Sequence, residues 1–396
     1  MPISRRGLLQ AGALATVAAS LRGDLLNEVF AVGPAFTPTS DRKIRIGVVG
    51  GGFGAAFHWH QHPNCVVEAV SDLIPDRRDT LMRVYGCQKA YESLEKLILD
   101  PRVEAVAVFT GAPDHARHVL LAMNAGKHVI SACPACTTLE EAQQLKETKE
   151  RTGLKYMMAE TSYYRWETIT ARRLFQDGKF GELVYSEGEY YHPMTGGERQ
   201  ALWFRGNERT WRYAYPPMLY PTHTTAFLVG VTGERLTRVS CVGWGDDDPA
   251  LKENAYNNPF ANETAMFTTD RGHAFRGNVC WNLHGHGERA QWFGTQGALF
   301  MDGFAGQPFR MLLADGTSVS ELPDYWHMVP EAMRYDSGHG RSHPFLTHEF
   351  IMALVEDREP AIDLYESLAI TVPGIVAHQS ALKGGEQLAV PSFDRK

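Results

Sequence analysis

Short apolar runs alternate with longer amphipathic segments over residues 43–160. The runs cover residues 44–49, 65–71, 103–109, 128–134 and 155–160, and the segments between them have the apolar spacing typical of helices. Strands that alternate with helices of this length predict a parallel sheet covered by helices. Residues 41–160 are therefore expected to form a doubly wound α/β domain.

The pattern changes after residue 160. Residues 165–178 favour a helix, and the next segment, LVYSEGEYYHP, alternates with the period of a half-buried strand. This alternation places Glu187, Glu189 and Tyr191 on one face of the strand and Tyr190 on the other. Residues 161–396 are therefore expected to form a second domain, which closes with a helix and a short final strand.

The first 40 residues differ from both halves. Arg5 and Arg6 precede a short apolar run over residues 8–19, which is too short to span a membrane. Paired arginines before such a run indicate a twin-arginine export signal followed by a linker; the alternative is an amphipathic start of the domain. We expect a periplasmic or secreted protein that is exported already folded.

Composition and charge limit the remaining function classes. The chain has 396 residues and a net charge of -7, which argues against a general nucleic-acid binder. Six cysteines scattered over a chain of this length do not form a disulfide framework. No apolar stretch is long enough to cross a membrane.

A glycine-rich turn follows the first apolar run. The sequence VVGGGFGAA contains the pattern G-x-G-x-x-A at Gly50, Gly52 and Ala55. The first glycine permits a tight turn, the second lets backbone approach a pyrophosphate, and the small third residue lets the expected helix pack on the strand. The predicted cofactor contacts in this turn are Gly50, Gly51, Gly52, Phe53 and Gly54.

An acidic residue ends the second apolar run. Asp72 stands about 20 residues after the glycine turn, where a carboxylate accepts hydrogen bonds from the adenosine ribose and repels a 2′-phosphate. This favours NAD over NADP as the cofactor, although Arg77 and Arg78 lie nearby. The alternative is a glycine-rich turn with a surface aspartate.

Three motifs together resemble the Gfo/Idh/MocA oxidoreductases. They are the strand and turn IRIGVVGGGFG, the segment TGAPDHARH, and the segment AGKHVISACP. The resemblance implies a Rossmann domain, a C-terminal α/β domain with an open, mostly antiparallel sheet, and a sugar or polyol bound between them. It also implies further cofactor contacts at Thr110, Pro113, His115, Cys133 and Pro134.

The Cys133-Pro134-Ala135-Cys136 segment departs from this family. Most members have Glu-Lys-Pro here, with a lysine that helps to move a proton; this chain has Ala132, Cys133 and Pro134. The favoured interpretation is a cavity wall. A disulfide or redox role after export and half of a metal site are the alternatives, although a second Cys-x-x-Cys is absent from the sequence. No metal is expected.

The segment LYPTH resembles a narrower group, the NAD-dependent glycosidases known for α-N-acetylgalactosaminidase activity. The resemblance implies a catalytic pair, Tyr220 and His223, and substrate contacts at Tyr190 and Glu160. Arg212 and His339 are also expected to contact the substrate, since the glycines that flank His339 let it approach a ligand. The chain departs from that group at Thr161, at Thr224 and Thr225, and in NLHGHGERAQW, which lacks the expected tyrosine. Structural alternatives are a buried histidine in a turn for His223, sheet packing for Tyr190 and an ion pair for Glu160.

These residues suggest one chemistry. A histidine beside a tyrosine can move a hydroxyl proton near neutral pH while NAD accepts hydride. Oxidation of a ring hydroxyl, expected at C3, acidifies the neighbouring C–H, so elimination, water addition and hydride return can cleave a glycoside without net redox. The alternatives are a net sugar dehydrogenase or sugar–sugar oxidoreductase, and a non-catalytic sugar-binding protein. The expected partners are a small-molecule sugar and further copies of the chain.

Overall fold

The computed structural model describes residues 36–37, 40–245 and 247–395. The predicted twin-arginine signal at Arg5 and Arg6 lies outside these residues. Within them, no helix has both the length and the apolar character that a membrane span requires.

A six-stranded parallel sheet forms the N-terminal part, in the order β3-β2-β1-β4-β5-β6. Its strands are β1 (Ile44–Val49), β2 (Cys65–Ser71), β3 (Ala90–Tyr91), β4 (Ala105–Val108), β5 (His128–Ser131) and β6 (Tyr156–Met158). The helices between them are α2 (Pro75–Tyr85), α3 (Leu94–Leu97), α4 (His115–Asn124) and α5 (Leu139–Thr152). Near-continuous burial along β1 and β4 is expected for a parallel sheet covered on both faces. This is the predicted doubly wound arrangement.

A nine-stranded sheet forms the second part, in the order β16-β15-β14-β13-β7-β12-β11-β10-β17. Its strands are β7 (Leu183–Tyr191), β10 (Leu236–Trp244), β11 (Asn262–Thr269), β12 (Ala274–Cys280), β13 (Gly287–Gly294), β14 (Gly297–Phe300), β15 (Arg310–Leu313), β16 (Ser318–Val319) and β17 (Leu388–Ala389). All pairs are antiparallel except β7 with β12. The expected mostly antiparallel second sheet is therefore confirmed.

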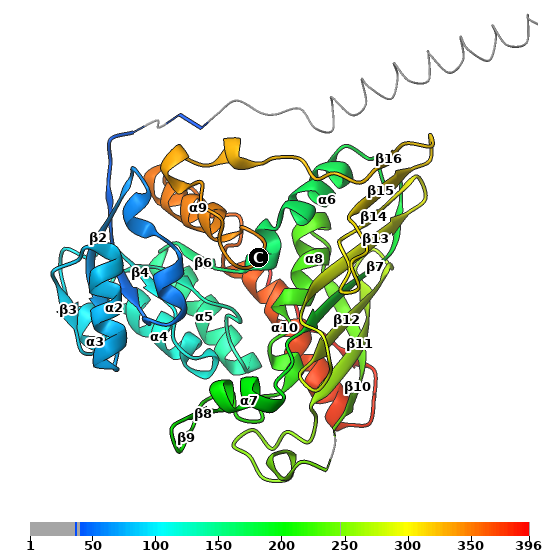
Figure 1. Cartoon of the computed structure of the whole chain (residues 1–396), viewed down its shortest axis with the longest axis horizontal. Helices are drawn as coiled ribbons and strands as arrows, with labels where there is room; N and C mark the ends of the chain where they lie inside the picture. The colour runs from blue at the N-terminus through cyan, green and yellow to red at the C-terminus, as the bar shows by residue number, and fades with distance from the viewer. Residues whose placement is uncertain (1–35, 38–39, 246, 396) are drawn as a thin grey trace, which may run out of the picture.

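Helices cover one face of the second sheet (Figure 1). They are α6 (Trp166–Gln176), α8 (Thr222–Thr232) and α10 (Leu364–Leu382), and α10 also packs against α5 and β6. On the other face Glu187 and Glu189 pair with Arg276 and Arg289, as the predicted alternation of β7 requires. Figure 1 shows α9 (His343–Val355) between the two sheets, and α7 (Gly196–Trp203) with the short hairpin β8 (Phe204–Arg205) and β9 (Glu208–Arg209) at one end.

The helix expected after the glycine turn is absent from the described structure. Two 3-10 segments, Phe53–Ala56 and Trp59–Gln61, take its place. His58 separates them with a left-handed φ of 46°, and Phe57 and Trp59 are fully buried there as side chains of the core. The prediction of a helix N-terminus facing a pyrophosphate is therefore wrong, because aromatic packing sets the course of this segment.

Candidate active site

The glycine turn borders a cavity of about 430 Å³. Gly50 has a left-handed φ of 100°, and a Cβ there would meet the carbonyl of Phe109 at the end of β4. Gly52 differs, since an added Cβ would meet nothing nearer than Arg77 Nη1 at 3.8 Å, which leaves its backbone open to a ligand. Gly50, Gly52, Phe53, Asp72 and Thr110 all line this cavity, as predicted for cofactor contacts.

Asp72 lies at the edge of this cavity and is held by backbone amides. Its carboxylate accepts hydrogen bonds from Gly51 N at 2.6 Å and from Ile74 N at 2.8 Å. The carboxylate therefore ties the glycine turn to the end of β2 and still faces the cavity. Arg78 donates to the backbone oxygen of Asp72 rather than to its side chain.

Several predicted cofactor residues support the loops instead of lining the first cavity. His115 is buried, and its ring nitrogens lie 2.8 Å from Pro134 O and 3.0 Å from Thr110 O, so its ring bridges two cavity loops. Gly51, Gly54, Pro113 and Pro134 line neither of the two large cavities. The structure therefore places these four predicted cofactor contacts outside the lining of both cavities.

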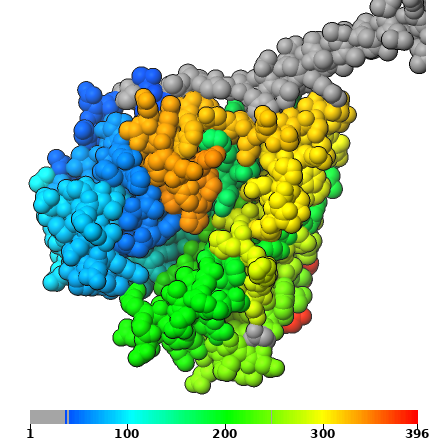
Figure 2. Space-filling view, viewed as in Figure 1, coloured from blue at the N-terminus to red at the C-terminus, as the bar shows by residue number. Residues whose placement is uncertain are grey.

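A second cavity of about 750 Å³ adjoins the first. Both are bordered by the same five residues, Phe53, Phe109, Thr110, Trp211 and Arg212. Figure 2 shows the α7–β9 segment, in green, lying beside the N-terminal domain and the strands of the second sheet. The two cavities meet at these five residues, so a ligand bound in the first cavity can extend into the second.

His223 is placed at the second cavity by α8, which begins after Pro221 and ends at Gly233 in a left-handed conformation. Every side chain of α8 is buried, so packing rather than helix propensity stabilises a segment this rich in β-branched residues. Thr224 and Thr225, the residues that depart from the glycosidase pattern, donate hydroxyl bonds to Pro221 O, and Thr225 also donates to Ile370 O on α10. The bonds to Pro221 O hold the first turn of α8, and the bond to Ile370 O ties α8 to α10.

Glu160 lies behind His223, away from the cavity. Its Oε1 is 2.9 Å from His223 Nδ1 and also accepts from Ser162 N at 2.9 Å. The side chain is fully buried and does not line the cavity. The prediction of a direct substrate contact is therefore wrong; Glu160 orients the imidazole, as a carboxylate does in a catalytic triad.

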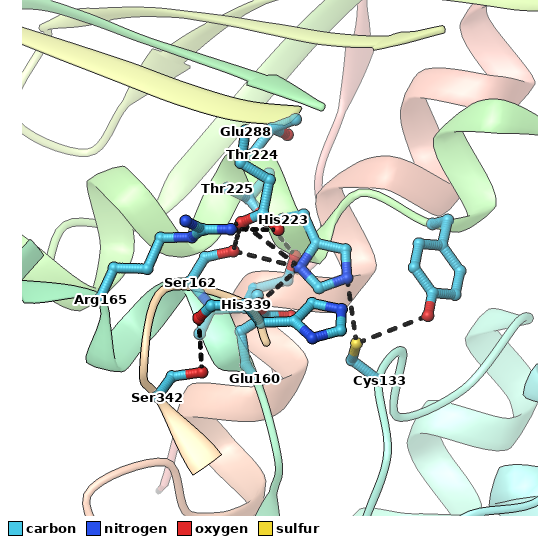
Figure 3. A network of polar contacts seen from close by, with 12 residues as sticks. Cys133, Glu160, Ser162, Arg165, His223, Thr224, Thr225, Glu288, His339 and Ser342 are labelled. Carbon is cyan, nitrogen blue, oxygen red and sulfur yellow. Dashed lines mark hydrogen bonds and ion pairs between the residues drawn. The ribbon is translucent and has the colours of Figure 1, made fainter. Parts of the chain in front are cut away.

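Glu288, which sequence reasoning missed, completes a buried network (Figure 3). Its carboxylate accepts from Ser162 Oγ at 2.5 Å and from Arg165 Nε at 2.9 Å, and it lies 3.9 Å from His223 Nδ1. It stands on β13, in the segment where a tyrosine was expected. The available signal was the alternation of GERAQWFG, which turns Glu288 toward the helices.

Cys133 stands at the position that resembles the family's lysine. Its Sγ lies 3.7 Å from His223 Nε2 and 3.9 Å from the hydroxyl of Tyr220. All six cysteines are free thiols, so Cys133 and Cys136 form no disulfide in this structure. Cys133 forms part of the wall of the second cavity, as expected, whereas Cys136 is buried outside it.

Aromatic and basic side chains complete the second cavity. Tyr190 packs 4.6 Å from His223 and 5.9 Å from Tyr220 between ring centroids. The Arg212 guanidinium lies 4.3 Å above Trp211 and 5.6 Å above Tyr220. His339, in a left-handed conformation with φ of 57°, lies 6.4 Å from His223. The structure thus brings Tyr190, Tyr220, Arg212, His223 and His339 together, as predicted.

Charge within the network favours a protonated His223. Burial opposes the imidazolium, but the ionised carboxylates of Glu160 and Glu288 raise the pKa of His223 well above its ordinary value. Burial likewise opposes ionised Glu288, but Arg165 and His223 lower its pKa to about 2. Burial raises the pKa of Cys133 and of Tyr220, so both stay neutral near pH 7. The resting site therefore holds an imidazolium whose Nε2–H faces the thiol.

The first cavity fits a dinucleotide. The open Gly52 backbone allows close approach by a phosphate, and the Asp72 carboxylate on the cavity wall could accept hydrogen bonds from ribose hydroxyls. The residues common to both cavities connect this site with the cavity of His223. The donor set that would hold NAD therefore consists of the glycine turn, Asp72 and Thr110.

Comparisons with known sequences agree with this geometry. The pattern of the oxidoreductase family with an NAD-binding Rossmann fold, Gfo/Idh/MocA, matches residues 44–160. A glycosyl hydrolase family 109 protein of Solibacter usitatus is 25% identical over 437 residues, covering 99% of this chain and 97% of its own. One from Saccharopolyspora erythraea is 23% identical, covering 100% and 95%.

Solved structures share the fold. Levoglucosan dehydrogenase in complex with NADH and levoglucosan has a TM-score of 0.74 at 19% identity, covering 89% of this chain and 100% of its own. An NAD-binding oxidoreductase from Klebsiella pneumoniae has a TM-score of 0.72 at 17% identity, covering 88% and 100%.

The fold and the two joined cavities define an NAD-dependent enzyme of the oxidoreductase type. Residues 44–160 carry the sequence pattern of the NAD-binding domain of the Gfo/Idh/MocA oxidoreductases.

Proposed function

We propose that this protein oxidises a ring hydroxyl of a sugar or glycoside, expected at C3, and cleaves the glycosidic bond without net redox. One observation carries the proposal: the cavity that fits NAD and the cavity that holds His223 have a common wall of five residues. Relatives with similarity along nearly their whole length are named glycosyl hydrolases, which supports cleavage as the net reaction.

NAD supplies a reversible hydride acceptor in this chemistry. The protein residues handle the protons. Glu160 holds His223 Nδ1, so Nε2 is the nitrogen that exchanges a proton with the substrate hydroxyl, and the Tyr220 hydroxyl lies beside the same thiol. His223 acts as a base only in its neutral form, in which Nε2 takes the proton of the substrate hydroxyl and the imidazolium then releases that proton to solvent in the cavity. Neutral again, His223 can remove the acidified proton next to the ketone, and the imidazolium formed in this step can protonate the leaving group.

Nucleotide content tests the first half of the proposal. The folded full-length protein is purified without added nucleotide and denatured, and released NAD(H) and NADP(H) are quantified. About one NAD per chain is the expected result for a cofactor that is retained and recycled. Protein that neither contains nor binds NAD would contradict the proposal and favour a sugar-binding role.

Product analysis tests the second half. Glycosides are incubated with the holoenzyme without added oxidant, and cleaved sugar and keto-sugar are both measured. Cleavage supports the proposal, whereas a keto-sugar that accumulates identifies a net dehydrogenase. His223→Ala should lower turnover ~10²–10⁴-fold, the usual range for loss of an acid–base group. The matched control His284→Ala changes an exposed histidine outside both cavities and should leave turnover unchanged.

We also propose that the protein is exported folded, on the basis of Arg5, Arg6 and the apolar run that follows them. Arg5→Lys with Arg6→Lys should retain the protein in the cytoplasm, and fractionation with immunodetection measures this. Unchanged export would contradict the proposal.

Pairing of two copies through the open face of the second sheet is proposed from its exposed apolar side chains. Val184, Val242, Trp244 and Met266 are each about half exposed there. Light scattering of the wild type and of Val242→Glu measures it; a monomeric wild type would contradict pairing.

A further inference from the structure

Two histidines and a glutamate meet at the solvent-exposed side of the second cavity. His192 directly follows β7, His286 directly precedes β13, and Glu198 lies in the first turn of α7. One ligand atom from each residue lies within 4.8 Å of the other two, and all three residues line this cavity. We propose that His192, Glu198 and His286 bind a zinc-class divalent cation whose remaining coordination positions are open to the cavity.

The register of the second sheet brings the two histidines together. Tyr191 on β7 pairs with Gly287 on the antiparallel strand β13, so the next residues outward, His192 and His286, stand opposite each other. Opposed residues of an antiparallel pair have their Cβ atoms about 4.5–5.5 Å apart. The two imidazole rings lie edge to face with centroids 4.8 Å apart. Backbone pairing of two strands therefore sets the distance between the two nitrogen ligands.

The ring nitrogen of His192 that faces Glu198 has no partner in the described part of the chain. This atom, Nδ1, is buried and makes no hydrogen bond, and Glu198 Oε1 lies 4.0 Å from it. A tetrahedral zinc ion ~2.0–2.1 Å from each ligand holds the ligand atoms about 3.4 Å apart. Since the Glu198 side chain is 49% exposed, a small rotation brings its carboxylate to that distance. An ion at this position would satisfy a nitrogen that is costly to leave unpaired.

The donor types and the charge of Glu198 suit a zinc-class ion. Two imidazole nitrogens and one carboxylate are the ligands of a common kind of zinc site. Within residues 40–245 and 247–395, Glu198 forms no ion pair with a lysine or an arginine, and its neighbour Arg199 pairs with Asp248. Arg212 lines the same cavity and opposes a cation there, so binding should depend strongly on the Glu198 carboxylate.

Zinc binding to the full-length protein tests the proposal without an activity measurement. Protein that carries no histidine tag and has been treated with a chelator is titrated with Zn²⁺ by calorimetry, and about one ion per chain is expected. His286→Ala should weaken binding at least ~100-fold, because the loss of even an outer partner of a metal site costs ~10–100-fold. The matched control His284→Ala removes an exposed histidine outside the cavity and should bind Zn²⁺ as the wild type does.

A second variant and a second metal locate the ion. Glu198→Gln keeps the shape of the side chain and removes its charge, so it should also weaken Zn²⁺ binding. Co²⁺ should bind without a thiolate-to-cobalt charge-transfer absorption. The proposal would be overturned by a wild type that takes up no Zn²⁺, by wild-type affinity in His286→Ala or Glu198→Gln, or by a thiolate absorption, which would place the ion at a cysteine. None of these results depends on whether the protein cleaves glycosides.

Discussion

His223 owes its chemistry to the residues that surround it. Burial alone would keep the imidazole neutral, but the Glu160 carboxylate at 2.9 Å reverses that preference and raises its pKa. A group whose pKa rises on folding gives stability that is present below its unfolded pKa and is lost as pH increases through the folded value. The His223–Glu160 pair should therefore stabilise the fold at neutral pH and weaken in alkali.

The pH dependence of hydride transfer tests this pair. The neutral form of His223 increases with pH, so the single-turnover rate of sugar oxidation should rise above pH 7. Glu160→Gln removes the carboxylate that favours the imidazolium, so the midpoint of the profile should move to lower pH. Glu187→Gln is the control, because Glu187 pairs with Arg276 on the face of β7 opposite to Tyr190. An unchanged midpoint in Glu160→Gln would contradict the assigned role.

The glycines of the turn should separate folding from cofactor binding. Gly52→Ala adds a methyl group where the structure has open space, so the fold should be retained while NAD binds at least tenfold more weakly, about 1.4 kcal/mol. Gly50→Ala should instead destabilise the fold, since φ there is 100°. Titration calorimetry and thermal unfolding measure the two effects. Unweakened NAD binding in Gly52→Ala would show that the cofactor does not approach this backbone.

At the scale of elements, α8 depends on close contact with β7. A Cβ on Gly188 would lie 2.6 Å from Thr224 O, so this glycine lets the helix that carries His223 approach the sheet. The contact joins the catalytic histidine to the sheet whose next strand, β13, carries Glu288. The positions of His223 and Glu288 relative to each other therefore depend on Gly188, which has no side chain.

Gly188→Ala should therefore lower stability by about 1–3 kcal/mol, the usual cost of overpacking a core. Urea unfolding measures the change. Gly197→Ala on α7 is the control, since an added Cβ there meets nothing within 4 Å. It should be neutral or slightly stabilising because alanine favours the helix. Equal stability of the two variants would show that α8 can shift without cost.

At the scale of the whole molecule, buried neutral histidines join the N-terminal domain to the helix between the sheets. Burial, then neighbouring histidines, lower the pKa of His62 and of His343 to about 3, and burial lowers that of His348 to about 4. His343 stacks on Phe57 at 4.6 Å, and His62 Nε2 lies 3.0 Å from His348 Nδ1. The unfolded chain binds protons at these groups before the folded chain does.

Stability should therefore fall as pH decreases below about 6.5, the unfolded value. At pH 5 each such histidine costs about 2 kcal/mol, from about 1.36 kcal/mol per pH unit. His343→Phe should remove about that much of the loss between pH 8 and pH 5, measured by urea unfolding at both values. His284→Ala is the exposed control. An equal pH dependence in wild type and His343→Phe would contradict the assignment.

Much of the N-terminal domain was predictable from the sequence. The apolar runs at 44–49 and 65–71, the glycine turn and Asp72 were sufficient, because the hydrophobic pattern of a strand and the backbone freedom of glycine belong to the residues themselves. The glycosidase-like segment likewise indicated Tyr220 and His223. The helix expected after the turn was wrong, since the burial of Phe57 and Trp59 depends on packing distant in sequence.

The tertiary structure alone decided how the site works. The sequence indicated Glu160 as a substrate contact, but the fold places it behind His223 and brings Glu288 from β13 to pair with Arg165 beside them. It also places the Cys133 thiol against the His223 ring. Charge interactions act through distances between atoms, and residues separated by 60 to 130 positions acquire those distances only when the two sheets pack together.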